Sequence, residues 1–94
     1  MRITVAYTPP FREDLDVSEE IYETEKDSAT VREVLELIVA RHPSMSRFVD
    51  ISGDEAQRRH LVVAVNSQLA RLSDRVHDGD GVRVLLPASG GSEQ

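Results

Sequence analysis

The sequence contains no cysteine and no tryptophan. Without a thiol the chain can form neither a disulfide nor a thiolate metal site, and it cannot store sulfur on a side chain. It also has no apolar run long enough to cross a bilayer, and its first residues lack the pattern of a signal peptide. We therefore expect a cytoplasmic protein without a membrane partner.

Basic charge is also scarce. Eleven Lys and Arg residues stand against 17 Asp and Glu residues, which gives a formal net charge of -6. Because nucleic-acid binding depends on neutralising phosphates, nucleic acid is not an expected partner. The 94 residues, 39% of them hydrophobic and 30% charged, fit one folded domain with little room for a deep catalytic cleft.

Alternating hydrophobic and polar residues predict strands near both ends of the chain. Residues 3–7 alternate with a period of two and are followed by Pro9. After a polar loop, residues 17–22 predict a weaker edge strand. The segment Asp-Gly-Asp-Gly at 78–81 predicts a turn, and residues 82–86 again alternate as a final strand.

The segment between these strands contains a clear helix signal. Thr30 and Glu33 have the spacing of a capping box, and apolar residues recur at helical spacing at Val31, Val34, Leu35, Ile38 and Val39. We predict a helix from Val31 to Arg41, ended by Pro43. Because its apolar stripe covers one face, the helix must pack on a broad surface such as a sheet.

Two less regular segments complete the pattern. In residues 44–59, the apolar positions predict a short helical turn, formed by Met45, Phe48, Val49 and Ile51. The continuous apolar run 61–65 predicts a central strand buried on both faces, followed by a turn at 66–67. The element order predicts an α+β fold in which one helix covers one face of a mixed sheet.

The C-terminal half combines several features of one family. A valine-rich strand at 63–66 is followed by Leu72, by the turn and strand start at 78–82, and by Leu-Pro-Ala-Ser-Gly-Gly at 86–91. This combination resembles the small ubiquitin-like sulfur carriers, which include the molybdopterin synthase small subunit and the carriers of the thiamine and cysteine pathways. The resemblance implies a β-grasp fold, with a mixed four- to five-stranded sheet and one main helix on one face.

The resemblance also implies a function for the tail. In this family a ubiquitin-activating-type adenylyltransferase uses ATP to adenylate the C-terminal glycine, and sulfur from a donor then replaces the adenylate. The thiocarboxylate passes its sulfur to a synthase. On this sequence the acceptor carbon is the carbonyl of Gly91, while Gly90, Ser89 and Ala88 would pass through the partner's channel. The carrier itself would bind no cofactor and would act as a co-substrate or small subunit, not as an enzyme.

This chain departs from the family pattern because Ser92-Glu93-Gln94 follows the second glycine. The carboxylate of Gly91 is therefore part of a peptide bond. The resemblance to tailed carriers implies cleavage between Gly91 and Ser92 by a zinc metalloprotease of the JAMM type. We expect residues 1–87 to form the domain and residues 88–94 to form a flexible tail.

An enzyme that processes the tail must grip the domain beside it. On that argument Pro87 and Leu85 are expected to contact the partner, with Arg83 as a charged residue at the rim. The length of the segment 44–59 fits the molybdopterin and cysteine branches better than the thiamine branch.

Other candidate sites are weaker. The three histidines, His42, His60 and His77, have no metal-ligand spacing, so we expect surface histidines and no metal site. Two carboxylate groups are interpreted as solvated faces without catalytic function; they are Glu13, Asp14 and Asp16, and Glu19, Glu20 and Glu23. Two alternatives to a sulfur carrier remain, a non-covalent β-grasp binding module and a ubiquitin-like modifier conjugated through Gly91.

Overall fold

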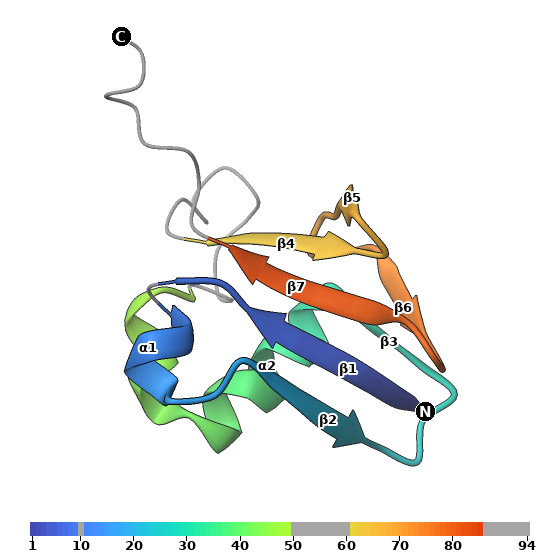
Figure 1. Cartoon of the computed structure of the whole chain (residues 1–94). Coiled ribbons are helices and arrows are strands. Elements are labelled where there is room, and N and C mark those ends of the chain that lie inside the picture. Colours follow the sequence, from blue (N-terminus) through green and yellow to red (C-terminus); the bar gives the residue numbers. More distant parts are fainter. Residues whose placement is uncertain (10, 50–60, 86–94) are drawn as a thin grey trace, which may run out of the picture.

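The computed structural model of the chain describes residues 1–9, 11–49 and 61–85. Five strands form one mixed sheet in the order β2-β1-β7-β4-β5 (Figure 1). Their bounds are Arg2–Tyr7 (β1), Glu19–Glu23 (β2), Val62–Val65 (β4), Gln68–Leu69 (β5) and Gly81–Leu85 (β7). Strands β1 and β7 are parallel, whereas the other neighbouring pairs are antiparallel.

The remaining elements lie around this sheet. Strand β3 (Ser28–Thr30) pairs with β6 (Arg75–His77) in a separate two-stranded sheet. Helix α2 (Val31–Arg41) lies against one face of the large sheet, α1 (Phe11–Leu15) follows β1, and the 3-10 helix η1 (Pro43–Arg47) follows α2. The predicted α+β architecture, a β-grasp sheet with one main helix on one face, is confirmed.

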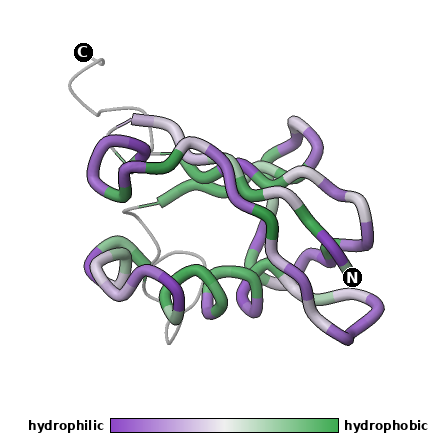
Figure 2. Tube along the Cα trace, turned by 60° about the horizontal axis from the view of Figure 1, so that its bottom comes forward, coloured by the Kyte–Doolittle hydropathy of each residue, from purple (hydrophilic) through white to green (hydrophobic). Residues whose placement is uncertain are grey.

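The core lies between α2 and the sheet. Val34, Leu35 and Ile38 of the helix are at most 1% exposed, and the alternate residues of β1 and β7 are buried opposite them. Figure 2 shows the same layering, with hydrophobic segments of the helix and strands facing the interior. Burial of each large apolar side chain contributes about 1.5–3 kcal/mol, so this interface dominates the stability of the domain.

The helix begins and ends where the sequence predicts. Thr30 Oγ1 accepts the amide of Glu33 at 3.2 Å, and Glu33 Oε1 accepts the amide of Thr30 at 2.9 Å. Both halves of the capping box are therefore present. After His42 the chain continues as η1, in which Pro43 occupies the first turn, and Met45 is buried as part of the core.

Two local predictions are wrong. Residues 61–65 were expected to form the central strand, but β7 occupies the middle of the sheet and β4 is the fourth strand. Val63 and Ala64, which point to opposite faces, are buried, whereas Val62 and Val65 at the ends of β4 are only partly buried, so burial on both faces holds for the middle of the strand alone. A continuous apolar run cannot show which face is covered, because an open face that binds a partner is apolar too.

The polar segment after Pro9 was expected to be a loop, but residues 11–15 form α1. Phe11 is fully buried and packs edge-on against Phe48, with ring centroids 4.9 Å apart. Asp16 then ends the helix with a φ of 57°. A contact with a residue far along the chain therefore stabilises a helix of only five residues, which has no periodic pattern to reveal it.

The short strands β3, β5 and β6 have no clear sequence signal, because each has only two or three residues. Within the part of the chain that the structure describes, no helix is long and apolar enough to span a membrane. The predicted boundary between domain and tail, at residues 87 and 88, lies outside the described residues.

Candidate docking face and carboxyl-terminal tail

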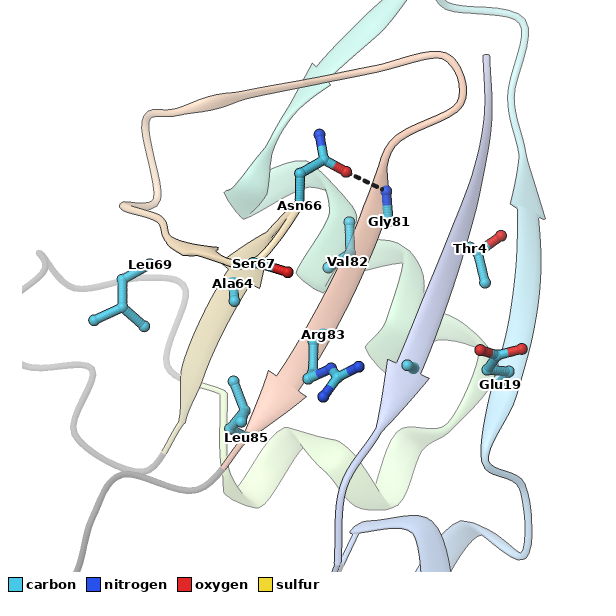
Figure 3. A pocket seen from close by; sticks show the side chains of 11 residues that line it. Thr4, Glu19, Ala64, Asn66, Ser67, Leu69, Gly81, Val82, Arg83 and Leu85 are labelled. Carbon is cyan, nitrogen blue, oxygen red and sulfur yellow. Dashed lines mark hydrogen bonds between the residues drawn. The ribbon is translucent and has the colours of Figure 1, made fainter.

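The face of the sheet opposite α2 carries a row of paired residues that runs across all five strands. Glu19 pairs with Ala6, Ala6 with Arg83, Arg83 with Ala64, and Ala64 with Leu69. Directly paired residues point to the same side of a sheet, so these side chains form one surface. All five line a single shallow hollow, which Figure 3 shows from close by.

One half of this surface is apolar. Leu69 is 78% exposed and, with Ile21, is one of two large hydrophobic residues that the described chain leaves exposed. Leu85 is half-buried and pairs with Val62, next to the row. An exposed leucine beside partly buried Leu85 and Val62 is typical of a protein interaction surface. We call this surface the docking face and define it by Val62, Ala64, Leu69, Arg83 and Leu85.

Arg83 lies at the middle of the docking face. The residues that pair with it across the sheet are Ala6 and Ala64, whose methyl side chains offer no polar group to its guanidinium. Among residues 1–9, 11–49 and 61–85, the guanidinium of Arg83 has no hydrogen bond or ion pair. An exposed guanidinium flanked by alanines on both neighbouring strands is available for a carboxylate on a partner, and arginine is enriched among residues that dominate binding energies.

The side chain of Asn66 fixes the position of β7. Its Oδ1 accepts the amide of Gly81 at 2.9 Å, as Figure 3 shows, and its Nδ2 donates to Asp80 Oδ1 at 3.0 Å. The backbone amide of Asn66 also donates to the carbonyl of Gly81 at 2.8 Å. Asn66 has a φ of 51°, which asparagine tolerates better than most residues. These bonds join the β4–β5 turn to the start of β7 and so set the register of Arg83.

Asp80 supports the same junction from the other side. Its Oδ2 accepts the amide of His77 at 2.8 Å, and this bond together with the bond from Asn66 lowers the pKa of the Asp80 carboxyl. Gly79, between the two turn aspartates, has a φ of 88°, which only glycine adopts without strain. The turn predicted at residues 78–81 is therefore confirmed.

A partly buried polar cluster, which no sequence pattern predicted, lies between β2 and the end of α2. Glu20 was expected to be solvated, but its side chain is only 14% exposed. It accepts hydrogen bonds from the hydroxyls of Tyr7 at 2.9 Å and Tyr22 at 2.8 Å, and its Oε2 lies 2.7 Å from His42 Nε2. Arg41 stacks over the ring of Tyr22 at 3.9 Å from its centroid.

The cluster shifts the ionisation of its members. Burial opposes the charged form of Glu20, but the hydrogen bonds from Tyr22, His42 and Tyr7 together outweigh burial and lower the pKa of the carboxyl. Burial also raises the pKa of Tyr7, and it raises the pKa of Tyr22 to about 12. Glu20 is therefore negatively charged near neutral pH, and its carboxylate links β2 to β1 and to the end of α2.

The structure corrects two predictions, that His42 lies at the surface and that Glu20 is solvated. His42 was expected at the surface, yet its side chain is only 18% exposed and it contacts Glu20. His77 is exposed on β6, and His60 lies outside the described residues. The carboxylates of Glu13, Asp14, Asp16, Glu19 and Glu23 are exposed, as predicted. Within the described ranges, no three His, Asp or Glu residues are close enough to hold a metal ion.

The predicted site residues fall into two groups. Arg83 and Leu85 lie two residues apart on the docking face, as their alternation along β7 requires. The others, Pro87, Ala88, Ser89, Gly90, Gly91 and Ser92, lie outside the described residues. Leu85 is the last residue that the structure describes, and it belongs to the docking face.

A β-grasp domain of this size, with one main helix on one face of a mixed five-stranded sheet, is the architecture of small ubiquitin-like carriers and modifiers. The model of the ThiS family matches residues 11–91. The chain therefore belongs to the ThiS family of small ubiquitin-like sulfur carriers. No curated protein matches the sequence.

Solved structures give the same fold. The SAMP1 crystal structure from Haloferax volcanii is similar with a TM-score of 0.79 and 24% identity, over 97% of this chain and 100% of that chain. A putative molybdopterin converting factor subunit 1 from Pyrococcus furiosus is similar with a TM-score of 0.74 and 30% identity, over 94% and 99%. A BexX/CysO complex from Amycolatopsis orientalis contains a chain similar with a TM-score of 0.67 and 26% identity, over 95% and 99%.

Proposed function

We propose that this protein carries sulfur as a thiocarboxylate on Gly91. Removal of Ser92–Gln94 frees the carboxylate, a partner enzyme adenylates it with ATP, and a sulfur donor replaces the AMP. The thiocarboxylate then gives its sulfur to a synthase in the biosynthesis of molybdopterin, cysteine or a related product. The protein is a co-substrate in this scheme and performs no catalysis itself.

The observation that carries this proposal is the position of Gly91 in the sequence, at the end of the family match and six residues after Leu85 of the docking face. The family match ends at Gly91, and three residues follow it. From Leu85 to Gly91 the chain has six residues, which extend about 20 Å at most. A partner that grips the docking face can therefore receive the tail in a recessed adenylation site.

Glycine suits both of the last two tail positions. A residue without Cβ passes through a narrow channel and adopts backbone angles that other residues avoid. Gly90 thus allows passage, and Gly91 presents a carbonyl carbon that neither a side chain nor a branched Cβ shields from the attacking sulfur.

The docking face supports the choice of partner. Its apolar half, with Leu69 and Leu85, offers surface to bury, and Arg83 offers a charge for one carboxylate. We propose that the adenylating enzyme binds here with a complementary surface, apolar around one acidic residue. The BexX/CysO complex shows that a structurally similar chain has been crystallised with a second protein.

The proposed cleavage requires a separate peptidase, for which we propose a zinc metalloprotease of the JAMM type.

The test of thiocarboxylate formation compares three forms of the protein, namely residues 1–94, residues 1–91, and residues 1–91 with Gly91→Ala. Each is incubated with the adenylating partner, ATP and a sulfur donor, and intact mass spectrometry measures the thiocarboxylate.

We expect the thiocarboxylate on residues 1–91, at least tenfold less of it on the Gly91→Ala form, and none on residues 1–94. The 1–94 form is the matched control, because its Gly91 carbonyl is part of a peptide bond. If residues 1–91 remain unmodified while an authentic carrier reacts in the same mixture, the proposal is wrong and a non-covalent binding module is favoured. Adducts on lysines of other proteins would instead favour a modifier.

A further inference from the structure

Strand β2 leaves one side of its backbone open. It is an edge strand of the large sheet and, with five residues, the longest edge strand in the part of the chain that the structure describes. The carbonyl of Ser18 accepts a hydrogen bond of 2.9 Å from β1, and the amide of Thr24 donates one of 3.0 Å to the residue before β1. Because backbone groups alternate in direction along a strand, those of Glu19, Ile21 and Glu23 face away from β1.

Intramolecular cations already lie at this edge. Arg41, at the end of α2, stacks over the ring of Tyr22, and its Nη1 donates to the carbonyl of Ile21 at 3.2 Å. Nε of Arg2 lies 3.0 Å from Oε2 of Glu23, although these two side chains are 66% and 65% exposed. The side chain of Ile21 is itself 50% exposed. The edge therefore accepts cationic donors and offers one apolar side chain for burial.

The negative charge of the protein is concentrated around this edge. Residues 13–27, which include β2, contain eight acidic residues and one lysine, which gives a net charge of -7. The rest of the chain has nine acidic and ten basic residues, which gives a net charge of +1 and accounts for the total of -6. Because complementary charge steers association and selects partners, an occupant of this edge is expected to be basic.

A second copy of β2 does not meet this requirement. Antiparallel pairing of two copies about Ile21 would place Glu19 of one copy opposite Glu23 of the other, and like charges directly opposite each other are destabilising. The carboxylate of Glu20, on the α2 side of the sheet, is a further charge that an added strand must accommodate. A strand with basic side chains accommodates these charges, and its apolar residues can cover Ile21.

We propose that the β2 edge, defined by Glu19, Ile21 and Glu23, is a second interaction surface, which takes an extended basic segment of a partner protein as an added strand. Main-chain hydrogen bonds provide affinity in this binding mode, and alternate side chains provide specificity. The added strand replaces the guanidinium of Arg41 at the carbonyl of Ile21. Strand β1 separates β2 from β7, the nearest strand of the docking face (Figure 1), so one copy can hold a partner at each surface. The inference does not require the thiocarboxylate.

The experiment adds a peptide probe to the full chain. The probe has eight residues, lysine and valine in alternation, and its matched control has the same sequence with every backbone amide N-methylated, which keeps the charge but removes the hydrogen-bond donors. NMR measures the affinity and the exchange rate of each protein amide. We expect the amides of Ile21 and Glu23, which face away from β1, to exchange at least fivefold more slowly when the probe is bound. The N-methylated peptide should bind at least tenfold more weakly.

Two double variants separate the β2 edge from negative charge in general. Glu19→Gln with Glu23→Gln removes two charges from the edge, whereas Glu13→Gln with Asp14→Asn removes two from exposed positions on α1. We expect the first pair to weaken binding of the probe at least fivefold and the second pair less than twofold, with unchanged melting temperatures. The inference is overturned if the probe fails to bind at millimolar concentration, if the N-methylated peptide binds equally well, if both pairs lose affinity equally, or if the slowed amides lie on the docking face instead.

Discussion

His42 and Glu20 lie 22 residues apart in the sequence, yet the imidazole Nε2 and a carboxylate oxygen are 2.7 Å apart in the fold. The same carboxylate accepts hydrogen bonds from the hydroxyls of Tyr7 and Tyr22. It therefore joins edge strand β2 to β1 and to the end of α2. An inward-pointing charge on an edge strand also disfavours pairing with another chain, because a new strand would have to accommodate it.

The first prediction concerns Glu20. Replacing it with Gln keeps the shape but removes the charge, and hydrogen bonds to charged groups contribute about 1.5–3 kcal/mol. We expect Glu20→Gln to lower the free energy of unfolding by about 1–3 kcal/mol near pH 7, measured by urea denaturation. Glu19→Gln, at an exposed position on the neighbouring residue, is the control and should change it by less than about 0.5 kcal/mol.

The stabilisation by Glu20 should depend on pH in a defined direction. Its pKa is lower in the folded protein than the ordinary value of 4.5, so its contribution is fully present above 4.5. The contribution is lost as the pH falls through the lower, folded-state pKa. Urea titrations from pH 7 to pH 3 should therefore show the gap between wild type and Glu20→Gln shrinking below about pH 4.5. A gap that stays constant or widens on acidification would contradict this linkage.

The third prediction concerns Asn66, whose side chain bonds to Gly81 and Asp80. Asn66→Gly keeps the positive φ but loses both bonds, and we expect a loss of about 1 kcal/mol. Asn66→Ala loses the same bonds and adds backbone strain, so we expect a further loss of about 1 kcal/mol. Equal denaturation midpoints for the two variants would show that the left-handed backbone of residue 66 costs nothing.

The fourth prediction compares two leucines. Leu35 in α2 is fully buried, whereas Leu69 on the docking face is 78% exposed. Leu35→Ala should cost about 2–5 kcal/mol, because it opens a cavity in the core. Leu69→Ala should change the free energy of unfolding by less than about 0.5 kcal/mol. If Leu69→Ala destabilises the domain strongly, then Leu69 belongs to the core and not to a free docking face.

The fifth prediction tests the docking face in binding. Arg83→Glu and Leu69→Ala should each weaken binding to the adenylating partner at least fivefold, since residues at the centre of an interface contribute more than 1 kcal/mol each. Calorimetric titration measures the affinity, and the melting temperature should not change. Arg47→Glu, which alters an exposed arginine on η1 instead of the sheet, is the control for net charge. Equal affinity of Arg83→Glu and the control would place the interface elsewhere.

Local signals determined several elements from the sequence alone. The capping box and the apolar spacing of residues 30–41 predicted α2 with its observed bounds, because both signals act within a few residues. The alternation in β1 and β7 predicted which of their residues are buried. The lack of cysteine excluded sulfur storage on a side chain. Gly90 and Gly91, together with the turn at residues 78–81, predicted a functional tail through the resemblance to the sulfur carriers.

Only the tertiary structure decided how distant segments meet. It placed β7 and not β4 at the centre of the sheet, since strand order depends on crossover connections that leave no local pattern. It stabilised α1 through the contact of Phe11 with Phe48, and it placed Glu20 in a partly buried position beside His42 although both occur in polar stretches. It also showed that Arg83 lies between two alanines, Ala6 and Ala64, on the neighbouring strands. These relationships depend on side chains brought together from different strands, which hydrophobic periodicity along one segment cannot encode.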